Sequence, residues 1–315
     1  MKFLVILLLI ATVTPQAYSS ALQCQDVLAD SQNSSKRTLA ELTAKYIDFK
    51  KQAPVRSRNY FQTLNEKYPR DQGQKAYEEW RKFAARDNKY LSKILAAIIN
   101  TPASERLAFL RSQSREQLLK MEELLDAYLG MDIAEMDRAI DSELNASSRR
   151  ELYGNEQIWY APGGGQQTNW KGVFEVVDAM NLQPGQIVTD LGSGIGRLGF
   201  AIGLLRPDVQ FVGLEIVKPR VEFAAAAAEK MGFANVHFVA GNLADHSLQL
   251  PHADHIYMFN PTTQETSDLL THRLAELAKV KYFKVYIRNR IDSDNFAKYF
   301  DRISSGAVSV WERKK

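Results

Sequence analysis

The segment that most constrains the fold is a glycine-rich turn in the second half of the chain. The apolar residues 187–188 lead into Asp190, and glycines follow at alternate positions, Gly192, Gly194 and Gly196. An amphipathic helical pattern begins directly after the last of them. Glycine lets a backbone turn sharply and approach a ligand closely, because no Cβ is in the way. The segment therefore predicts a strand, a tight turn and a helix, in the order found at α/β nucleotide sites.

A second strand with an acidic tip follows the turn. The apolar run 211–214 ends in Glu215. A carboxylate at the tip of this strand can accept hydrogen bonds from both hydroxyls of a ribose. Together, the glycine turn and this acid predict a site for an adenosine-containing cofactor.

Two cofactors are compatible with the glycine pattern, NAD and S-adenosylmethionine (SAM). Residues 194–199 satisfy the bare G-x-G-x-x-G pattern of dinucleotide binding. However, Asp190 ends the strand two residues before the first glycine, where its carboxylate would repel a pyrophosphate. The same carboxylate would attract the ammonium group of a methionine. The acid therefore favours SAM, and an NAD-dependent oxidoreductase is the more distant alternative.

At this point the sequence resembles the class I SAM-dependent methyltransferases, whose D-x-G-x-G-x-G motif reads Asp190-Leu-Gly-Ser-Gly-Ile-Gly196 here. Two further predicted strands with polar tips, residues 236–242 and 255–260, follow in the order of that family. The resemblance covers residues 151–315. It implies an α/β, Rossmann-like methyltransferase domain with a seven-strand sheet.

The resemblance also implies roles for single residues. Asp190 and the glycine turn would hold the methionine end of SAM, Glu215 the ribose, and Asn242 with Leu243 the adenine. Asn260 would lie beside the reactive methyl group as a substrate contact, although Asn260-Pro261 equally fits a simple strand terminator. The cofactor-binding candidates are Asp190, Gly192, Ser193, Gly194, Gly196, Glu215, Asn242, Leu243 and Asn260, and Asn260 is also the catalytic candidate.

The methyl acceptor is less constrained. Asn260 is followed by Pro-Thr-Thr and not by Pro and an aromatic residue, which argues against base-methylating enzymes of the Asn-Pro-Pro-Tyr type. Tyr153-Gly154 and the cofactor motif look like the seven-strand protein-lysine methyltransferases, so we expect a protein substrate, with lysine first. With 40 basic and 37 acidic residues the net charge is only +3, and we expect no nucleic-acid partner. A module that binds SAM without catalysis is the alternative.

Three further features have two interpretations each. His252 and His255 suggest a metal pair, but no thiolate or clear third ligand accompanies them, so we expect no metal site. Arg288 and Arg290 follow the fifth predicted strand, where they could meet an acidic substrate or form a solvated surface. The glycine-rich residues 162–165 fit either a lid over the cofactor or a linker between domains.

Periodicity places the other elements of this domain. Apolar residues at helical spacing predict helices over 170–180, 197–205, 217–231 and 267–278, with Gly232 as a C-terminal cap. Residues 282–287 are predicted as a fifth strand, and 300–303 with 307–311 as a closing hairpin.

The first half of the chain has a different character. A basic start, a short apolar core and small residues describe a signal peptide or short membrane anchor over residues 1–21, so we expect an exported or membrane-anchored protein with no other membrane contact. Cys24 is the only cysteine, which rules out an internal disulfide. Residues 22–150 predict an all-helical accessory domain that selects substrate or forms a homodimer. Within it, Thr101-Pro102 opens a helix with one apolar face, Leu107, Leu110, Leu118, Met121, Leu125 and Tyr128.

Overall fold

The computed structural model describes residues 39–51, 89, 91–131, 168–259, 263–288 and 293–314. The chain divides into two compact units, residues 1–102 and 103–315. In the first unit α3 (Leu39–Lys51) and residues 91–100 are helical. None of the described helices is long and apolar enough to cross a membrane. Several predicted features lie outside the described residues, namely segment 1–21, Cys24, Tyr153-Gly154, residues 162–165, Asn260 and Arg290.

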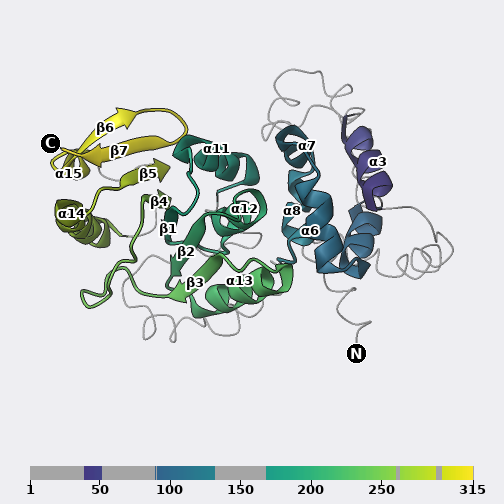
Figure 1. Cartoon of the computed structure of the whole chain (residues 1–315), viewed down its shortest axis with the longest axis horizontal. Coiled ribbons are helices and arrows are strands. Elements are labelled where there is room, and N and C mark those ends of the chain that lie inside the picture. Colours follow the sequence, from purple (N-terminus) through teal and green to yellow (C-terminus); the bar gives the residue numbers. More distant parts are fainter. Residues whose placement is uncertain are drawn as a thin grey trace, which may run out of the picture. The chain divides into compact units, whose positions relative to one another are not determined.

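The second unit is built on a seven-strand mixed sheet with the order β3-β2-β1-β4-β5-β7-β6 (Figure 1). The strands are β1 (Ile187–Leu191), β2 (Gln210–Glu215), β3 (Val236–Ala240), β4 (His255–Phe259), β5 (Lys284–Arg288), β6 (Phe300–Ser304) and β7 (Ser309–Arg313). Strands β1 to β5 are parallel, and β7 pairs antiparallel with both β5 and β6. The predicted α/β fold with its closing hairpin is therefore confirmed. Because the carboxyl ends of the parallel strands β1 and β2 meet at one edge, Asp190 and Glu215 are brought together there.

Helices cover both faces of this sheet. On one face, α14 (Gln264–Val280) and α15 (Ser293–Phe296) pack against residues of β1, β4 and β5 in an apolar cluster. The cluster includes Leu274 of α14, Ile256 of β4 and Val285 of β5. On the other, α11 (Trp170–Met180) packs against α12 (Arg197–Leu205), whose Phe200 stacks on Phe238 of β3 at 6.0 Å between ring centroids. Helix α13 (Lys218–Met231) packs against β2 and β3.

Helix boundaries follow local chemistry. Asn169 caps α11, because its Oδ1 accepts the Gly172 N–H at 2.9 Å. Gly232 has φ 73° and ends α13, as predicted. Helices α11 and α12 coincide with the predicted ranges, since the apolar spacing that defines them is also the spacing that buries them.

The single helix expected after Pro102 is instead three short ones, α6 (Ala103–Arg111), α7 (Arg115–Lys120) and α8 (Glu122–Tyr128). Ser114 interrupts the first helix by forming a reciprocal capping box with Gln117, at 3.2 and 2.7 Å. The apolar residues of the predicted face are buried, except Leu107, which is half-buried. These helices belong to the same compact unit as the sheet. The predicted boundary at residue 150 lies outside the described residues and stays a prediction.

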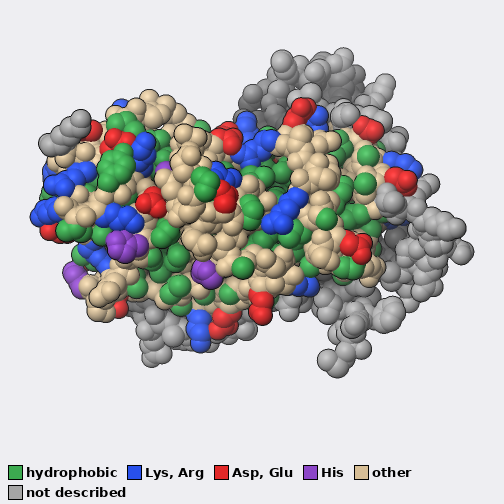
Figure 2. All heavy atoms as spheres, viewed as in Figure 1, with side chains coloured by type: hydrophobic (Ala, Val, Ile, Leu, Met, Phe, Trp, Pro, Cys, Tyr) green, Lys and Arg blue, Asp and Glu red, His purple; other side chains and the backbone are tan. Residues whose placement is uncertain are grey.

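The surface carries charges of both signs. Basic and acidic side chains are interspersed on the face that Figure 2 shows, in keeping with a net charge of +3 over the whole chain.

His255, at the start of β4, is a buried histidine with hydrogen-bond contacts at both ring nitrogens. Its Nε2 lies 3.0 Å from Gln186 Oε1, and its Nδ1 lies 3.1 Å from Tyr286 Oη. Because an amide oxygen only accepts, Nε2 carries the proton and Nδ1 accepts from the tyrosine hydroxyl. Within the described residues no three His, Cys, Asp or Glu side chains are grouped to hold a metal ion.

Protonation of His255 is expected to destabilise the fold in acid. Burial lowers the pKa of His255 from 6.5 to about 4. Between these values the unfolded chain binds a proton that the folded chain does not, so stability falls as the pH drops through this window. We therefore expect the Tm of the wild type to decline more steeply from pH 7 to pH 4.5 than that of His255→Gln. Parallel curves of Tm against pH would show that the imidazole is not the responsible group.

Candidate active site

The glycine turn between β1 and α12 has the conformation that the sequence predicts. Gly192, Gly194 and Gly196 all have positive φ, 87°, 56° and 85°. The N–H groups of Gly192 and Ser193 donate to the Leu214 carbonyl at 2.9 and 2.8 Å. The turn is thereby fastened to the adjacent strand β2, and α12 begins directly after it at Arg197.

Glu215 ties the tip of β2 to this turn. Its side chain is buried, and its Oε2 accepts the Gly194 N–H at 2.8 Å. Its Oε1 accepts the Val217 N–H at 3.0 Å and lies 3.5 Å from Arg220 Nη1. The carboxylate is therefore bonded to the glycine turn through one oxygen and to the residues after β2 through the other. These bonds fix the position of Glu215, the residue predicted to bind the ribose.

Asp190 presents a second buried carboxylate at the end of β1. It is 4% exposed and lies beside Tyr257 of β4 and Gly213 of β2 in the register of the sheet. Burial, and secondarily the Glu215 carboxylate, raises the pKa of Asp190 well above its usual range. A positively charged ligand group entering this site would offset both effects. The electrostatics thus favour a cationic group against Asp190, as the SAM interpretation requires.

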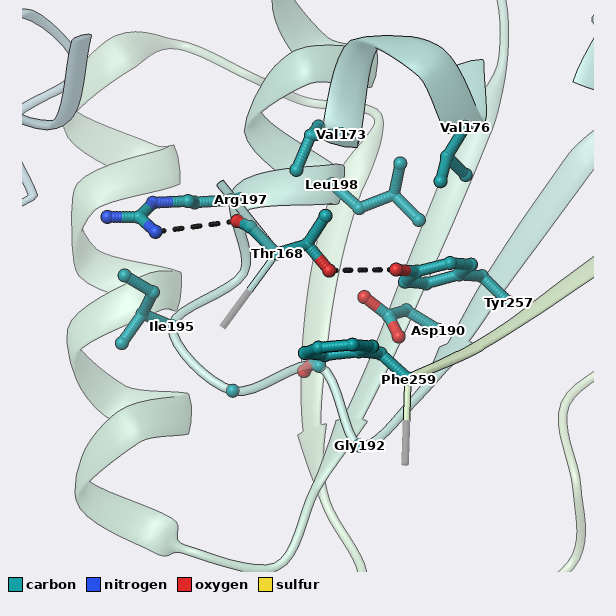
Figure 3. A pocket seen from close by; sticks show the side chains of 12 residues that line it. Thr168, Val173, Val176, Asp190, Gly192, Ile195, Arg197, Leu198, Tyr257 and Phe259 are labelled. Carbon is teal, nitrogen blue, oxygen red and sulfur yellow. Dashed lines mark hydrogen bonds between the residues drawn. The ribbon is translucent and has the colours of Figure 1, made fainter. Parts of the chain in front are cut away.

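A pocket opens in front of Asp190 (Figure 3). Of the predicted residues, Asp190, Gly192, Ser193 and Gly194 line it. Ile195 of the same turn lines it too, and the other lining residues lie before α11 (Thr168), on α11 (Val173, Val176), on α12 (Arg197, Leu198) and on β4 (Tyr257, Phe259). The glycine turn therefore forms one wall of a pocket whose remaining walls the motif does not reveal.

Tyr257 and Phe259 are the principal site residues that the sequence reasoning missed. Both point into the pocket from β4 (Figure 3). The Tyr257 hydroxyl is hydrogen-bonded to Thr168 Oγ1 at 2.8 Å. Burial raises the pKa of Tyr257, so its phenol stays neutral. A signal was present in the sequence, because alternate residues of a strand share a face, so Tyr257 and Phe259 lie on the same side of β4.

Three other predicted residues, Gly196, Asn242 and Leu243, are not among the lining residues of this pocket. Asn242 follows β3, and its Oδ1 accepts the Ala244 N–H at 2.9 Å, which fixes the side chain in a turn. Leu243 packs into the apolar cluster with Leu191 and Leu214. Gly196 lies against the ring of Phe238. The adenine role of Asn242 and Leu243 stays a prediction, as does any role of Asn260.

Arg288 lies at the carboxyl end of β5, close to α11. A Cβ added at Gly172 would come within 2.0 Å of Arg288 Nη1, so the guanidinium in this position occupies the space beside a glycine of α11. Nη1 also lies 3.4 Å from Glu175 Oε2. Arg288 is therefore held against α11, and contact with an acidic substrate stays a prediction.

Comparison with known proteins gives a family match for part of the chain. A family model described as a methyltransferase domain matches residues 182–280, which include the glycine turn, Asp190 and Glu215. Among solved structures, the RNA methyltransferase from Salinibacter ruber in complex with S-adenosyl-L-homocysteine is 19% identical, with a TM-score of 0.37, over 47% of this chain and 92% of that chain.

Curated relatives match over shorter stretches. A tRNA (guanine-N(7)-)-methyltransferase from Synechococcus sp. is 43% identical over 54 residues, which cover 17% of this chain and 23% of the relative. Ribosomal RNA small subunit methyltransferase G from Deinococcus deserti is 37% identical over 67 residues, 21% of this chain and 28% of the relative. This chain thus spans about a quarter of the length of these relatives.

The prediction of a protein partner and no nucleic acid was wrong, because these relatives are named for transfer RNA and ribosomal RNA. Two physical reasons account for the error. Net charge averages over the whole surface, so a value near zero does not exclude a local contact with nucleic acid. The likeness to lysine-methylating enzymes rested on the cofactor motif, and a cofactor site does not determine the acceptor.

The family match, the sheet order and the buried carboxylate at the glycine turn agree with one another. Residues 182–280 contain the motif from which the resemblance was drawn, and the structure places that motif at the carboxyl edge of a seven-strand sheet. Residues 182–280 of the sheet domain therefore match a methyltransferase domain, and the seven-strand sheet has the Rossmann-like architecture that the resemblance to class I methyltransferases implies.

Proposed function

We propose that this protein is a SAM-dependent methyltransferase and that methyl transfer takes place at the pocket in front of Asp190. The observation that carries the proposal is a buried carboxylate with a raised pKa at a turn of positive-φ glycines. That carboxylate is matched to the ammonium group of the methionine moiety. Glu215, bonded to the same turn, is matched to the ribose.

Bound SAM supplies a methyl group on a sulfonium, which passes to the lone pair of an acceptor while the electrons of the carbon–sulfur bond stay on sulfur. This chemistry needs in-line placement of the acceptor more than it needs a proton carrier. The residues of the chain accordingly bind and orient. Asp190 would hold the methionine end of the cofactor, and the rings of Tyr257 and Phe259 line the same pocket.

We further propose RNA as the first acceptor class. Support comes from the names of the curated relatives, which methylate transfer RNA and ribosomal RNA. The test is transfer of a labelled methyl group from SAM to total RNA, with Asp190→Asn as the variant of reduced activity at SAM concentrations below saturation. Label that resists ribonuclease and is removed by protease would overturn the RNA proposal. Binding of SAM without transfer to either fraction would favour the non-catalytic module.

Cofactor binding is tested most directly by calorimetric titration of the full chain with SAM, and with NAD as a competitor from another class. We expect saturable SAM binding and none with NAD. Asp190→Asn keeps the shape but removes the charge, and loss of a charge-assisted hydrogen bond is expected to weaken binding about 10- to 100-fold. Because the carboxylate is buried with a raised pKa, the amide should not lower Tm. The exposed Asp301, replaced by asparagine, is the matched control.

A result of NAD binding in place of SAM would contradict the proposed function. So would SAM affinity equal in the wild type and in Asp190→Asn, since the charge of Asp190 is the feature on which the choice of cofactor rests.

A further inference from the structure

We propose that Asp126, on α8, is a positioning residue for the cofactor pocket and acts through Arg197. The proposal rests on the proposed function, because its readout is cofactor affinity. It also gives the helices before the sheet domain a definite role, since α8 lies outside the matched family segment 182–280.

Asp126 makes three contacts with two residues of the sheet domain. Its Oδ2 accepts from Arg197 Nη2 at 2.5 Å, and its Oδ1 accepts from Arg197 Nε at 3.0 Å. Oδ1 also accepts the indole N–H of Trp170 at 2.9 Å. The Asp126 and Arg197 side chains are only 20% and 17% exposed. A two-point contact of this kind fixes the plane of the guanidinium as well as its position.

Arg197 carries this constraint to the pocket. It is the first residue of α12, directly after the glycine turn, and it lines the pocket. Asp126 engages Nε and Nη2, which leaves Nη1 directed to the Thr168 carbonyl at 3.4 Å. The Thr168 hydroxyl in turn bonds to Tyr257, so a chain of contacts crosses the pocket from α12 to β4 (Figure 3).

The helix that carries Asp126 is itself anchored. Arg106 of α6 is 4% exposed, and its Nη1 donates to the carbonyl of Ala127, the residue after Asp126, at 3.0 Å. Arg115 of α7 donates to the Phe174 carbonyl of α11 at 3.1 Å and lies over the Phe174 ring at 4.2 Å. Arg106 thus holds α8, and Arg115 holds α7 against α11. Because α8 is held independently of Arg197, Asp126 fixes the orientation of the Arg197 side chain.

A positioning role of Asp126 and a purely structural role predict different results when Asp126 and Arg197 are substituted together. If Asp126 acts through Arg197, its removal matters only while Arg197 is present, and the two substitutions are not additive. If Asp126 only stabilises the fold, its removal lowers Tm and affects affinity equally in both backgrounds. The double-mutant cycle on cofactor affinity therefore distinguishes the two.

The experiment is calorimetric titration of the full chain with S-adenosyl-L-homocysteine, using Asp126→Ala, Arg197→Ala, the double variant and Asp126→Asn. We expect Asp126→Ala to weaken affinity about ten-fold, as loss of one partner of a poorly exposed ion pair does. The double variant should bind no more weakly than Arg197→Ala. Asp126→Asn keeps the Oδ1 acceptor for Trp170 and for Arg197 Nε, and should recover affinity to within about three-fold of the wild type.

Glu122→Ala provides the matched control, because Glu122 is an exposed acid one turn earlier on the same helix. Thermal melting of each variant shows whether it is folded. If Asp126→Ala is not, the cycle of Asp126→Asn with Arg197→Ala carries the test: the loss of about two- to three-fold caused by the amide should disappear in the Arg197→Ala background. Unchanged affinity in both Asp126 variants, or fully additive losses in the double variant, would overturn the positioning role. Absence of binding by the wild type would instead overturn the proposed function, and the inference with it.

Discussion

Replacement of Glu215 by alanine is expected to weaken SAM binding at least about 100-fold, since it removes a ligand and also releases the turn that forms the pocket wall. The carboxylate accepts the Gly194 N–H at 2.8 Å and the Val217 N–H at 3.0 Å, and Arg220 lies beside it with its side chain 12% exposed. Breaking a buried pair by removing one partner costs about 3–5 kcal/mol. The variant should therefore lose stability in chemical denaturation as well as affinity in calorimetry.

The controls for Glu215 separate these two losses. Glu215→Gln keeps the size and one acceptor oxygen, so it should retain more stability than alanine while losing the charge opposite Arg220. Glu222→Ala removes an exposed acid whose partner, Lys218, is 3.6 Å away, and should change stability by less than about 0.5 kcal/mol. Wild-type affinity in a folded Glu215→Ala variant would exclude Glu215 as the ribose ligand.

Substitution of Gly196 by alanine is the second change with a large expected effect. Gly196 has φ 85°, and a Cβ there would lie 2.4 Å from the Phe238 ring. The strain of a positive φ adds about 1–2 kcal/mol, and overpacking adds about 1–3 kcal/mol. We expect a loss of about 2–5 kcal/mol in the free energy of unfolding, and weaker SAM binding because the turn shifts.

Gly185→Ala is the matched control for Gly196→Ala. Gly185 also has a positive φ, 79°, but nothing lies within 4 Å of an added Cβ. Its substitution should cost only the conformational strain, about 1–2 kcal/mol. Chemical denaturation of the two variants thus isolates the steric contact with Phe238. Equal losses in both would show that the Phe238 ring yields at no cost.

The sequence predicted the cofactor half of the site because its signals are local. A positive φ favours glycine, a strand tip carries its acid directly after the apolar run, and apolar spacing defines α11 and α12. Each of these signals is read from a few consecutive residues, so Asp190, Glu215 and the glycine turn could be identified and ordered.

The break after Arg111 and the role of the short helices were not predicted. Apolar residues of α6, α7 and α8 keep the same spacing through the interruption at Ser114, so periodicity alone indicated one continuous helix. Local hydrogen bonding by Ser114 and Gln117 decided the break.

By itself, the sequence determined the fold class, the glycine turn and the identity of the two acids that flank it, because backbone sterics and strand periodicity act between residues close in the chain. Only the tertiary structure decided the other walls of the pocket. The register of β1 against β4 sets Tyr257 beside Asp190, and the packing of α8 brings Asp126 to Arg197, 71 positions away. Contacts at such separation depend on how whole elements pack, and no local pattern encodes them.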